Sequence, residues 1–158
     1  ETWTEGVVAN FARDPQGNDT AQIRAVAAGE CRVGIANTYY VARLLRSEDE
    51  ADQAVAEKIG VIFPEQDGRG THVNISGAGL LAHAPNKDNA VRFLEFLTSD
   101  WAQKVLADGN NEYPAVASVD VEGPVTALGT FKEDEINASA LGENQSLAIR
   151  IYDRAGWR

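Results

Sequence analysis

Short apolar runs alternate along this chain with longer stretches in which apolar residues recur at helical spacing. Apolar runs at 32–36 and 60–63 each follow a helical stretch, at 19–28 and 47–58 respectively. A chain that alternates between helices and short apolar strands is typical of an α/β fold. We therefore predict an α/β architecture in which helices flank a largely parallel sheet.

Further elements extend this pattern toward the end of the chain. Two more strands are expected at 72–75 and 80–83, on either side of a glycine-containing turn. The remaining helices are expected at 3–12, 90–97, 101–107 and 147–155. Ligands of largely parallel sheets bind beyond the carboxyl ends of the strands, close to helix amino termini. Candidate binding residues are therefore expected directly after a strand.

Two adjacent tyrosines, Tyr39 and Tyr40, stand at such a place in the segment GIANTYYVARLL. On a strand their side chains would point to opposite faces of the sheet. Asn37 and Thr38 are good amino-terminal caps, however, so the tyrosines are expected in the first turn of a helix. There, two phenol oxygens can converge on one point above the helix end. The alternative is that one ring packs in the core while the other lies at the surface.

A pair of phenols with a nearby arginine suits a hard, highly charged metal ion. A phenol has a pKa of about 10, so only a strong Lewis acid offsets its deprotonation at neutral pH. The positive end of the helix dipole favours the phenolate, and Arg43 lies on the same side, where it can donate hydrogen bonds. Ferric iron suits phenolate better than zinc or copper does. The residues therefore predict half of a site for Fe³⁺, with a surface ion pair as the alternative for Arg43.

Composition argues against several other classes of function. The net charge of −10 and a pI of about 4.6 speak against a nucleic-acid partner, because phosphate binding needs clustered Lys and Arg. We expect no enzyme, because the sequence has no recognisable nucleophile with a base, no glycine-rich nucleotide loop and no paired carboxylates. A small enzyme that uses a tyrosine as general acid is the alternative. Cys31, the only cysteine, is expected to be a buried, inert thiol.

Four other polar residues are explained without a metal. His72 begins an expected strand and His83 ends one, so both are expected in the scaffold. Asn18 and Asp19 precede an expected helix, where they either cap it or help to hold an anion at its amino terminus. Because a cap explains them equally well, they are not among the candidate site residues.

The segment around the tyrosines, GECRVGIANTYYVARLL, closely resembles the tandem-tyrosine segment of periplasmic ferric-iron-binding proteins, the solute receptors of bacterial iron ABC importers. Further segments resemble the same proteins in the same order, namely WTEGVVANFARDPQGNDTAQIRAVAAGE, HVNISGAGLLAHAPNKDNAVRFLEFLTSDWAQKVLA, NEYPAV and IRIYDRAGW. The resemblance covers essentially all 158 residues, and colinear segments are more specific than one motif. It implies a periplasmic-binding-protein-like fold of type II, with two hinged lobes.

This resemblance also implies roles for individual residues. Tyr39 and Tyr40 match iron ligands in the family. Asn37 and Arg43 match positions beside the iron that support those ligands. The transported ligand would be Fe³⁺, in some members together with a synergistic anion such as carbonate. Such a receptor works in the periplasm and delivers iron to an inner-membrane ABC permease; the same fold with a polyamine, sugar or oxyanion is the alternative.

Members of this family are about twice as long, so the resemblance implies a carboxy-terminal half whose amino-terminal half is missing. Residues 1–70 are then expected to form part of the iron-binding lobe and 71–117 to pack with the other lobe. Residues 118–158 are expected to return to the first lobe as a helical segment. The acidic start and the absence of methionine also favour a processed or partial chain. No apolar stretch approaches the span of a bilayer.

Overall fold

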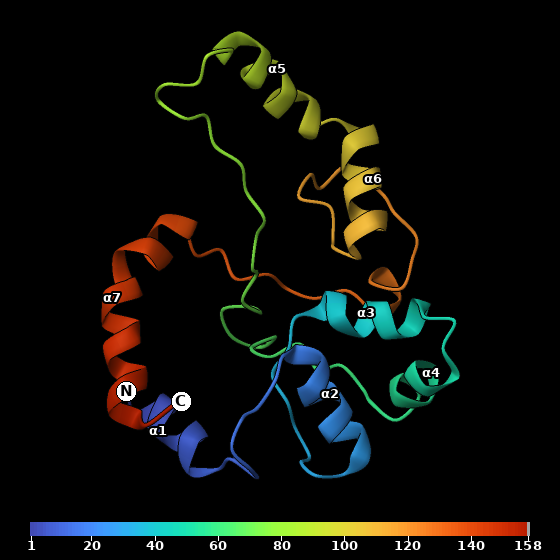
Figure 1. The fold of residues 1–158 in the computed structure, drawn as a ribbon, viewed down its shortest axis with the longest axis vertical. Coiled ribbons are helices and arrows are strands. Elements are labelled where there is room, and N and C mark those ends of the chain that lie inside the picture. The colour runs from blue at the N-terminus through green and yellow to red at the C-terminus, as the bar shows by residue number, and fades with distance from the viewer. Residues whose placement is uncertain (158) are drawn as a thin grey trace.

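A computed structural model describes residues 1–157 of the chain, and helices dominate this part (Figure 1). The elements in chain order are α1 (Thr2–Ala9), α2 (Asp19–Ala28), α3 (Thr38–Arg46), α4 (Glu50–Ala56), α5 (Lys87–Leu97), α6 (Asp100–Asn110), the short 3-10 helix η1 (Thr126–Leu128) and α7 (Ala138–Ala155). Among the described helices, none combines the length and apolar character that crossing a bilayer requires.

Local capping signals explain where several of these helices begin and end. The Asn18 side chain accepts a hydrogen bond from the Ala21 N–H at the start of α2, and Gly29 ends the helix in the left-handed region (φ 80°). Helix α6 was expected over 101–107, with the following Gly109 as its stop, but it continues through Gly109 to Asn110 and has Asn111 as its cap (φ 59°). A glycine inside a helix costs only about 1 kcal/mol relative to alanine, so Gly109 alone does not stop the helix.

The predicted parallel sheet is not formed within residues 1–157. The pairing found there is one isolated parallel bridge between Thr71 and Glu133, in which the Thr71 N–H donates to the Lys132 carbonyl (2.8 Å). The segments expected as strands, 32–36, 60–63, 72–75 and 80–83, have no strand partner in the described chain. A strand is stabilised by hydrogen bonds from a neighbouring strand, and these segments have no neighbour to supply them.

Apolar side chains on the unpaired segments consequently remain open to solvent. Val33, Ile62 and Leu81 retain 75%, 83% and 77% of their accessible surface. Val and Ile are strand-forming residues that are most often buried. The pattern that predicted strands is therefore present in the sequence, although the sheet is not.

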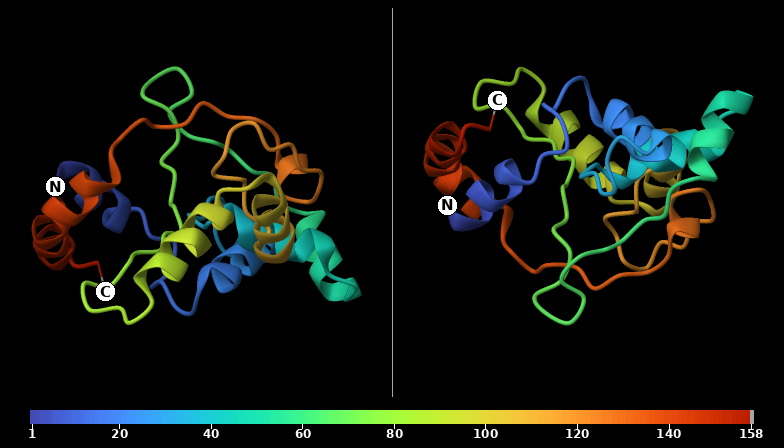
Figure 2. Two further views of the ribbon diagram at one scale, coloured as in Figure 1. Left: turned by 90° about the horizontal axis from the view of Figure 1, so that it is seen from above. Right: turned by 90° about the horizontal axis from the view of Figure 1, so that it is seen from below.

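Contacts between helices define three groups, which Figures 1 and 2 show from different sides. Helices α2, α3 and α4 pack together, α1 packs against α7 near the two chain ends, and α5 packs against α6. A long extended stretch leads from the first group to α5, as the green trace in Figure 1 shows. The group formed by α2, α3 and α4 carries the candidate site.

The main apolar core lies beneath α3. Ile23 of α2, Val41 and Leu44 of α3 and Ala56 of α4 form its buried cluster, and the ring of Tyr40 packs against it. Helices α5 and α7, in contrast, bury none of their described residues. The tyrosine-bearing helix α3 is therefore anchored in the main core, whereas α5 and α7 are not.

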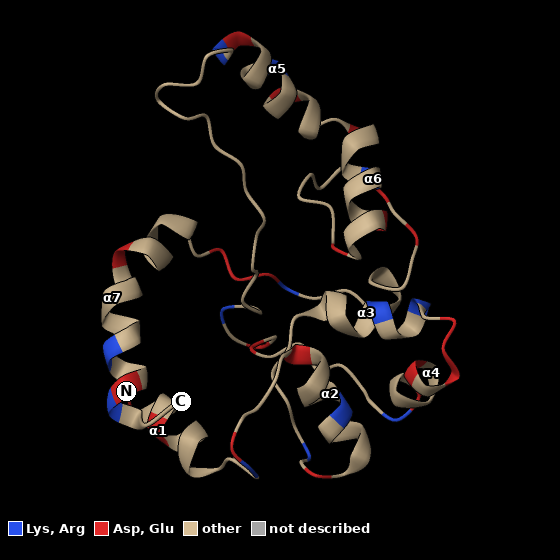
Figure 3. Ribbon diagram, in the orientation of Figure 1, with Lys and Arg blue, Asp and Glu red and all other residues tan. Residues whose placement is uncertain are grey.

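One arginine ties α3 to α6. The Arg46 guanidinium donates to the Asp108 carbonyl oxygen (2.6 Å) and also forms an ion pair with the Asp108 carboxylate. Because the unsatisfied carbonyls at a helix carboxyl end attract cations, this contact joins the last turn of α3 to the last turn of α6. Figure 3 shows other Lys and Arg residues dispersed over helices and loops, and acidic residues gathered near the start of α4.

A candidate metal centre at the start of helix α3

Tyr39 and Tyr40 occupy the first turn of α3, where the caps placed them. The Tyr40 N–H donates to the carbonyl oxygen of Asn37 (3.2 Å), which closes that turn. The two rings lie side by side, with centroids 4.4 Å apart and planes tilted by 36°. Both side chains are half-buried; the Tyr40 ring packs against the apolar core, and Tyr39 is not among the side chains that pack there.

The Arg43 guanidinium lies over both rings. Its central carbon is 5.4 Å from the Tyr39 centroid and 5.5 Å from the Tyr40 centroid, within the range of cation–π contacts. Within residues 1–157 no carboxylate forms an ion pair with Arg43. The described structure therefore does not contain the surface ion pair that was the alternative for Arg43. The hydrogen-bond donors of the Arg43 guanidinium remain available.

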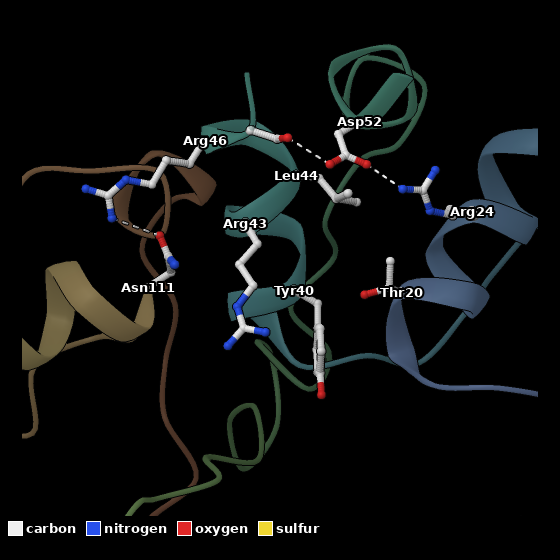
Figure 4. A pocket seen from close by; sticks show the side chains of 9 residues that line it. Thr20, Arg24, Tyr40, Arg43, Leu44, Arg46, Asp52 and Asn111 are labelled. Atoms are coloured by element: carbon white, nitrogen blue, oxygen red, sulfur yellow. Dashed lines mark hydrogen bonds and ion pairs between the residues drawn. The ribbon is translucent and has the colours of Figure 1, made fainter. Parts of the chain in front are cut away.

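A pocket of about 370 Å³ opens beside Tyr40 and Arg43 (Figure 4). The other residues that line it are Thr20, Arg24, Leu44, Arg46, Ser47, Asp52 and Asn111. Arg24 pairs with the Asp52 carboxylate, which also accepts a hydrogen bond from the Ser47 hydroxyl (2.8 Å). Two of the three arginines around this pocket, Arg24 and Arg46, thus have acidic partners, while Arg43 faces the phenols.

The pKa of Tyr39 is raised above that of an ordinary phenol. The largest cause is hydrogen bonding with the Tyr40 side chain, followed by burial and then by the negative charges of Tyr40 and Asp19, while Arg43 acts in the opposite direction. The helix dipole is not among these causes, so the expectation that the helix end favours the phenolate stays a prediction. Removing both phenol protons would eliminate the hydrogen bond between the phenols and bring negative charge toward Asp19, and a bound cation is what offsets such a cost.

Asn37 does not cap α3 with its own side chain. Its backbone N–H and its side-chain amide both donate to the Asp19 Oδ2, at 2.9 and 3.2 Å. The Asn37 Oδ1 in turn lies 3.5 Å from the Asn74 amide. Asp19 is thus a residue of this site that the sequence reasoning passed over. The available signal was that Asn18 already caps α2, which leaves the Asp19 carboxylate for another partner.

Other polar residues contribute no metal site to the described chain. Within residues 1–157, no group of three or more His, Cys, Asp or Glu side chains is arranged to hold a metal ion, so His72 and His83 belong to no such cluster. Cys31 is half-buried rather than buried, because the segment around it lacks the sheet that was expected to cover it.

The sequence profile of bacterial extracellular solute-binding proteins matches residues 3–133. The chain belongs to this family. Two relatives from Synechocystis sp. are iron uptake proteins A1 and A2. Their sequences are 53% and 52% identical to this one, over alignments that cover 99% of the chain. The major ferric iron-binding protein of Neisseria meningitidis is 26% identical over 91% of it.

Solved structures of solute-binding proteins superimpose closely on this chain. The Trichodesmium protein FutA (IdiA), solved with iron and citrate, gives a TM-score of 0.96 at 55% identity over 99% of the chain. Apo FutA2 from Synechocystis gives 0.95 at 52% identity, and a ferric binding protein from Campylobacter jejuni gives 0.90 at 44%. The fold of the described chain is thus that of part of a periplasmic ferric-binding protein.

The chain spans about half the length of the curated relatives it matches. It covers 43% of iron uptake protein A1 and 46% of iron uptake protein A2, and 49% of the Trichodesmium chain. The two Synechocystis relatives are uptake proteins by name. In these relatives, the same fold includes a further stretch of chain about as long as the one described here. The segments without strand partners therefore belong to a fold that is larger in the relatives.

Proposed function

We propose that this chain is part of a ferric-iron-binding solute receptor, in which the phenolates of Tyr39 and Tyr40 bind Fe³⁺. The observation that carries this proposal is the side-by-side arrangement of the two rings on one helical turn, with Arg43 over both. Hard phenolate oxygens match a hard trivalent ion, and its charge offsets the cost of removing two phenol protons.

Arg43 and Asn37 support these ligands without binding the iron. The Arg43 guanidinium lies over both rings and carries hydrogen-bond donors for a phenolate, and charge-assisted bonds of this kind are stronger than neutral ones. Asn37 holds the start of the helix through its carbonyl bond to the Tyr40 N–H. Mutation of residues that orient metal ligands typically costs about 10- to 100-fold in metal affinity.

The named relatives support iron as the transported ligand. They are iron uptake and ferric iron-binding proteins, and the Trichodesmium structure contains iron together with citrate. Two phenolates fill only part of the coordination sphere of Fe³⁺. A synergistic anion such as carbonate, beside the available donors of Arg43, is one source of further ligands, and the remainder of the receptor is the other.

We also propose how the chain fits into a receptor of about twice its length. Residues 1–70 form part of the iron-binding lobe, 71–117 pack with the other lobe, and 118–158 return to the first. The extended segments then find their partners in a largely parallel sheet of the whole type II fold, which accounts for their exposed apolar side chains. The receptor works in the periplasm and delivers iron to an inner-membrane ABC permease.

Addition of ferric citrate to the natural full-length protein tests this function. Phenolate coordination to Fe³⁺ produces a visible charge-transfer band, and one equivalent of iron is expected to saturate it. A colourless protein that instead binds a polyamine, a sugar or an oxyanion would overturn the proposal in favour of the same fold with another ligand.

A further inference from the structure

We infer that Asp19 is a positioning residue for iron capture, whose carboxylate fixes the first turn of α3 and with it the two phenols. This inference rests on the proposed function, because it assigns a role within the same site. Asp19 belongs to α2, and it lies 18 residues before Asn37 in the chain. The contact therefore joins two helices and is independent of the local sequence around the tyrosines.

The hydrogen bonds form a continuous path from Asp19 to the backbone of Tyr40. The Asp19 Oδ2 accepts from the backbone N–H of Asn37 (2.9 Å) and from its side-chain amide (3.2 Å). The Asn37 carbonyl oxygen accepts from the Tyr40 N–H (3.2 Å). Asn37 is thus hydrogen-bonded both to Asp19 and to Tyr40. Its position therefore fixes where the first turn of α3 begins.

Helix α3 begins without a side-chain cap, as α1 and α5 also do. Most helices satisfy their first N–H groups with the side chain of the cap residue, but the Asn37 side chain makes no such bond. Asp19 takes over the task of fixing the cap residue. Its carboxylate is available because Asn18 performs the capping of α2, and its negative charge is favourable near the amino termini of both helices.

Precise placement matters for a metal site more than for an ordinary helix start. Two phenolate oxygens bind one ion only if they converge, and ligand-orienting contacts typically change metal affinity by about 10- to 100-fold. A contact that fixes the first turn of α3 therefore contributes to affinity without touching the iron. It also affects the electronic environment of the bound phenolates, which the charge-transfer band reports.

Two substitutions in the natural full-length protein test the inference. Asp19→Ala removes the acceptor, and is expected to weaken iron binding about 10- to 100-fold in citrate competition and to shift the visible band of the loaded protein. Asp19→Asn keeps an oxygen that accepts from the Asn37 N–H, and is expected to recover most of the affinity and the parent band. Asp14→Ala removes the same charge from an exposed side chain nearby, and is expected to behave as the parent.

The outcomes separate this inference from the proposed function. A parent that binds no iron contradicts the proposed function itself. A parent that binds iron, with an Asp19→Ala variant of equal affinity and equal band, overturns only the role of Asp19, as does an equal loss in the Ala and Asn variants. If Asp19→Ala does not fold, Asp19→Ser replaces it with the same expected loss, because serine suits a helix start but is too short to reach Asn37.

Discussion

Tyr39 and Tyr40 are neighbours in the chain, and their rings also lie side by side in space, with centroids 4.4 Å apart. A strand would have placed them on opposite faces. The first turn of α3 is what brings both phenols to one side, and Arg43, on the next turn, covers them together. The predictions below follow from this relationship and from the packing around it.

Replacing either tyrosine by phenylalanine should remove iron coordination but retain the fold. Tyr39→Phe and Tyr40→Phe each keep the ring that packs and delete the oxygen that binds. Each is expected to bleach the visible band and to weaken iron binding, with an unchanged circular dichroism spectrum. Tyr152→Phe, on α7, is the matched control and should retain colour and affinity. Unchanged colour and iron stoichiometry in the double variant would contradict the ligand assignment.

Arg43 should support the phenolates both by charge and by shape. Arg43→Ala is expected to weaken iron binding about 10- to 100-fold in competition with citrate. Arg43→Lys should recover only part of this loss, because an ammonium keeps the charge but lacks the planar guanidinium that covers two rings. Arg150→Ala removes an exposed arginine of α7 and serves as control. Parent affinity in Arg43→Ala would speak against the assignment.

Tyr113 should stabilise the loop that contains η1. Its hydroxyl lies within hydrogen-bonding distance of the carbonyl oxygens of Val125 (2.9 Å) and Gly129 (3.1 Å), and its ring contacts Phe131. Tyr113→Phe keeps the ring and loses the donor. We expect the free energy of unfolding to fall by about 1 kcal/mol, measured by urea denaturation of the natural full-length protein at pH 8. An equal or higher stability would contradict this role.

The stability difference between the parent and Tyr113→Phe should depend on pH in the alkaline range. Burial raises the pKa of Tyr113, so the folded state prefers the protonated phenol. Below the unfolded pKa of about 10 both states are neutral and the contribution to stability is complete. As the pH rises further, the unfolded state loses its proton first and the contribution declines. Parent and Tyr113→Phe should therefore converge in stability above about pH 10; a constant difference would refute this.

The isolated chain should be only marginally stable, because many of its apolar side chains lack partners. Phe93 on α5 and Trp101 on α6 are 58% and 65% exposed, and the described residues include no large, fully buried side chain. Each Å² of apolar surface left uncovered forgoes about 25 cal/mol, against a typical domain stability of about 5–15 kcal/mol. We expect residues 1–158 alone to self-associate or unfold easily and to hold iron weakly.

Co-expression with the remainder of the natural protein tests this expectation. The added chain should yield a soluble complex with a sharper unfolding transition and tighter iron binding. Analytical ultracentrifugation and thermal denaturation of the isolated chain provide the comparison. A cooperative, monomeric transition together with tight iron retention by the isolated chain would refute it.

Features that depend on neighbouring residues were predictable from the sequence. The capping residues and Gly29 placed α2 correctly, because a helix start or stop is decided within a few residues. Asn37 and Thr38 also marked the start of α3 and so placed the tyrosines in its first turn, although the Asn37 side chain forms no capping bond there. The helical period also located α5 and α6, although α7 begins at Ala138 rather than near Leu147, because its first turns lack the strong apolar stripe of its last ones.

Features that join distant residues were decided only by the tertiary structure. The sequence pattern indicated strands, but a strand is complete only when another segment pairs with it, and the described residues supply no such neighbour. Likewise, the sequence predicts that Asn37 is an ordinary helix cap. Only the structure shows that its N–H groups donate to Asp19 of another helix. The sequence alone determined which turn presents the phenols; packing of α2 against α3 decided how that turn is held, because hydrogen bonds between helices depend on their placement in space.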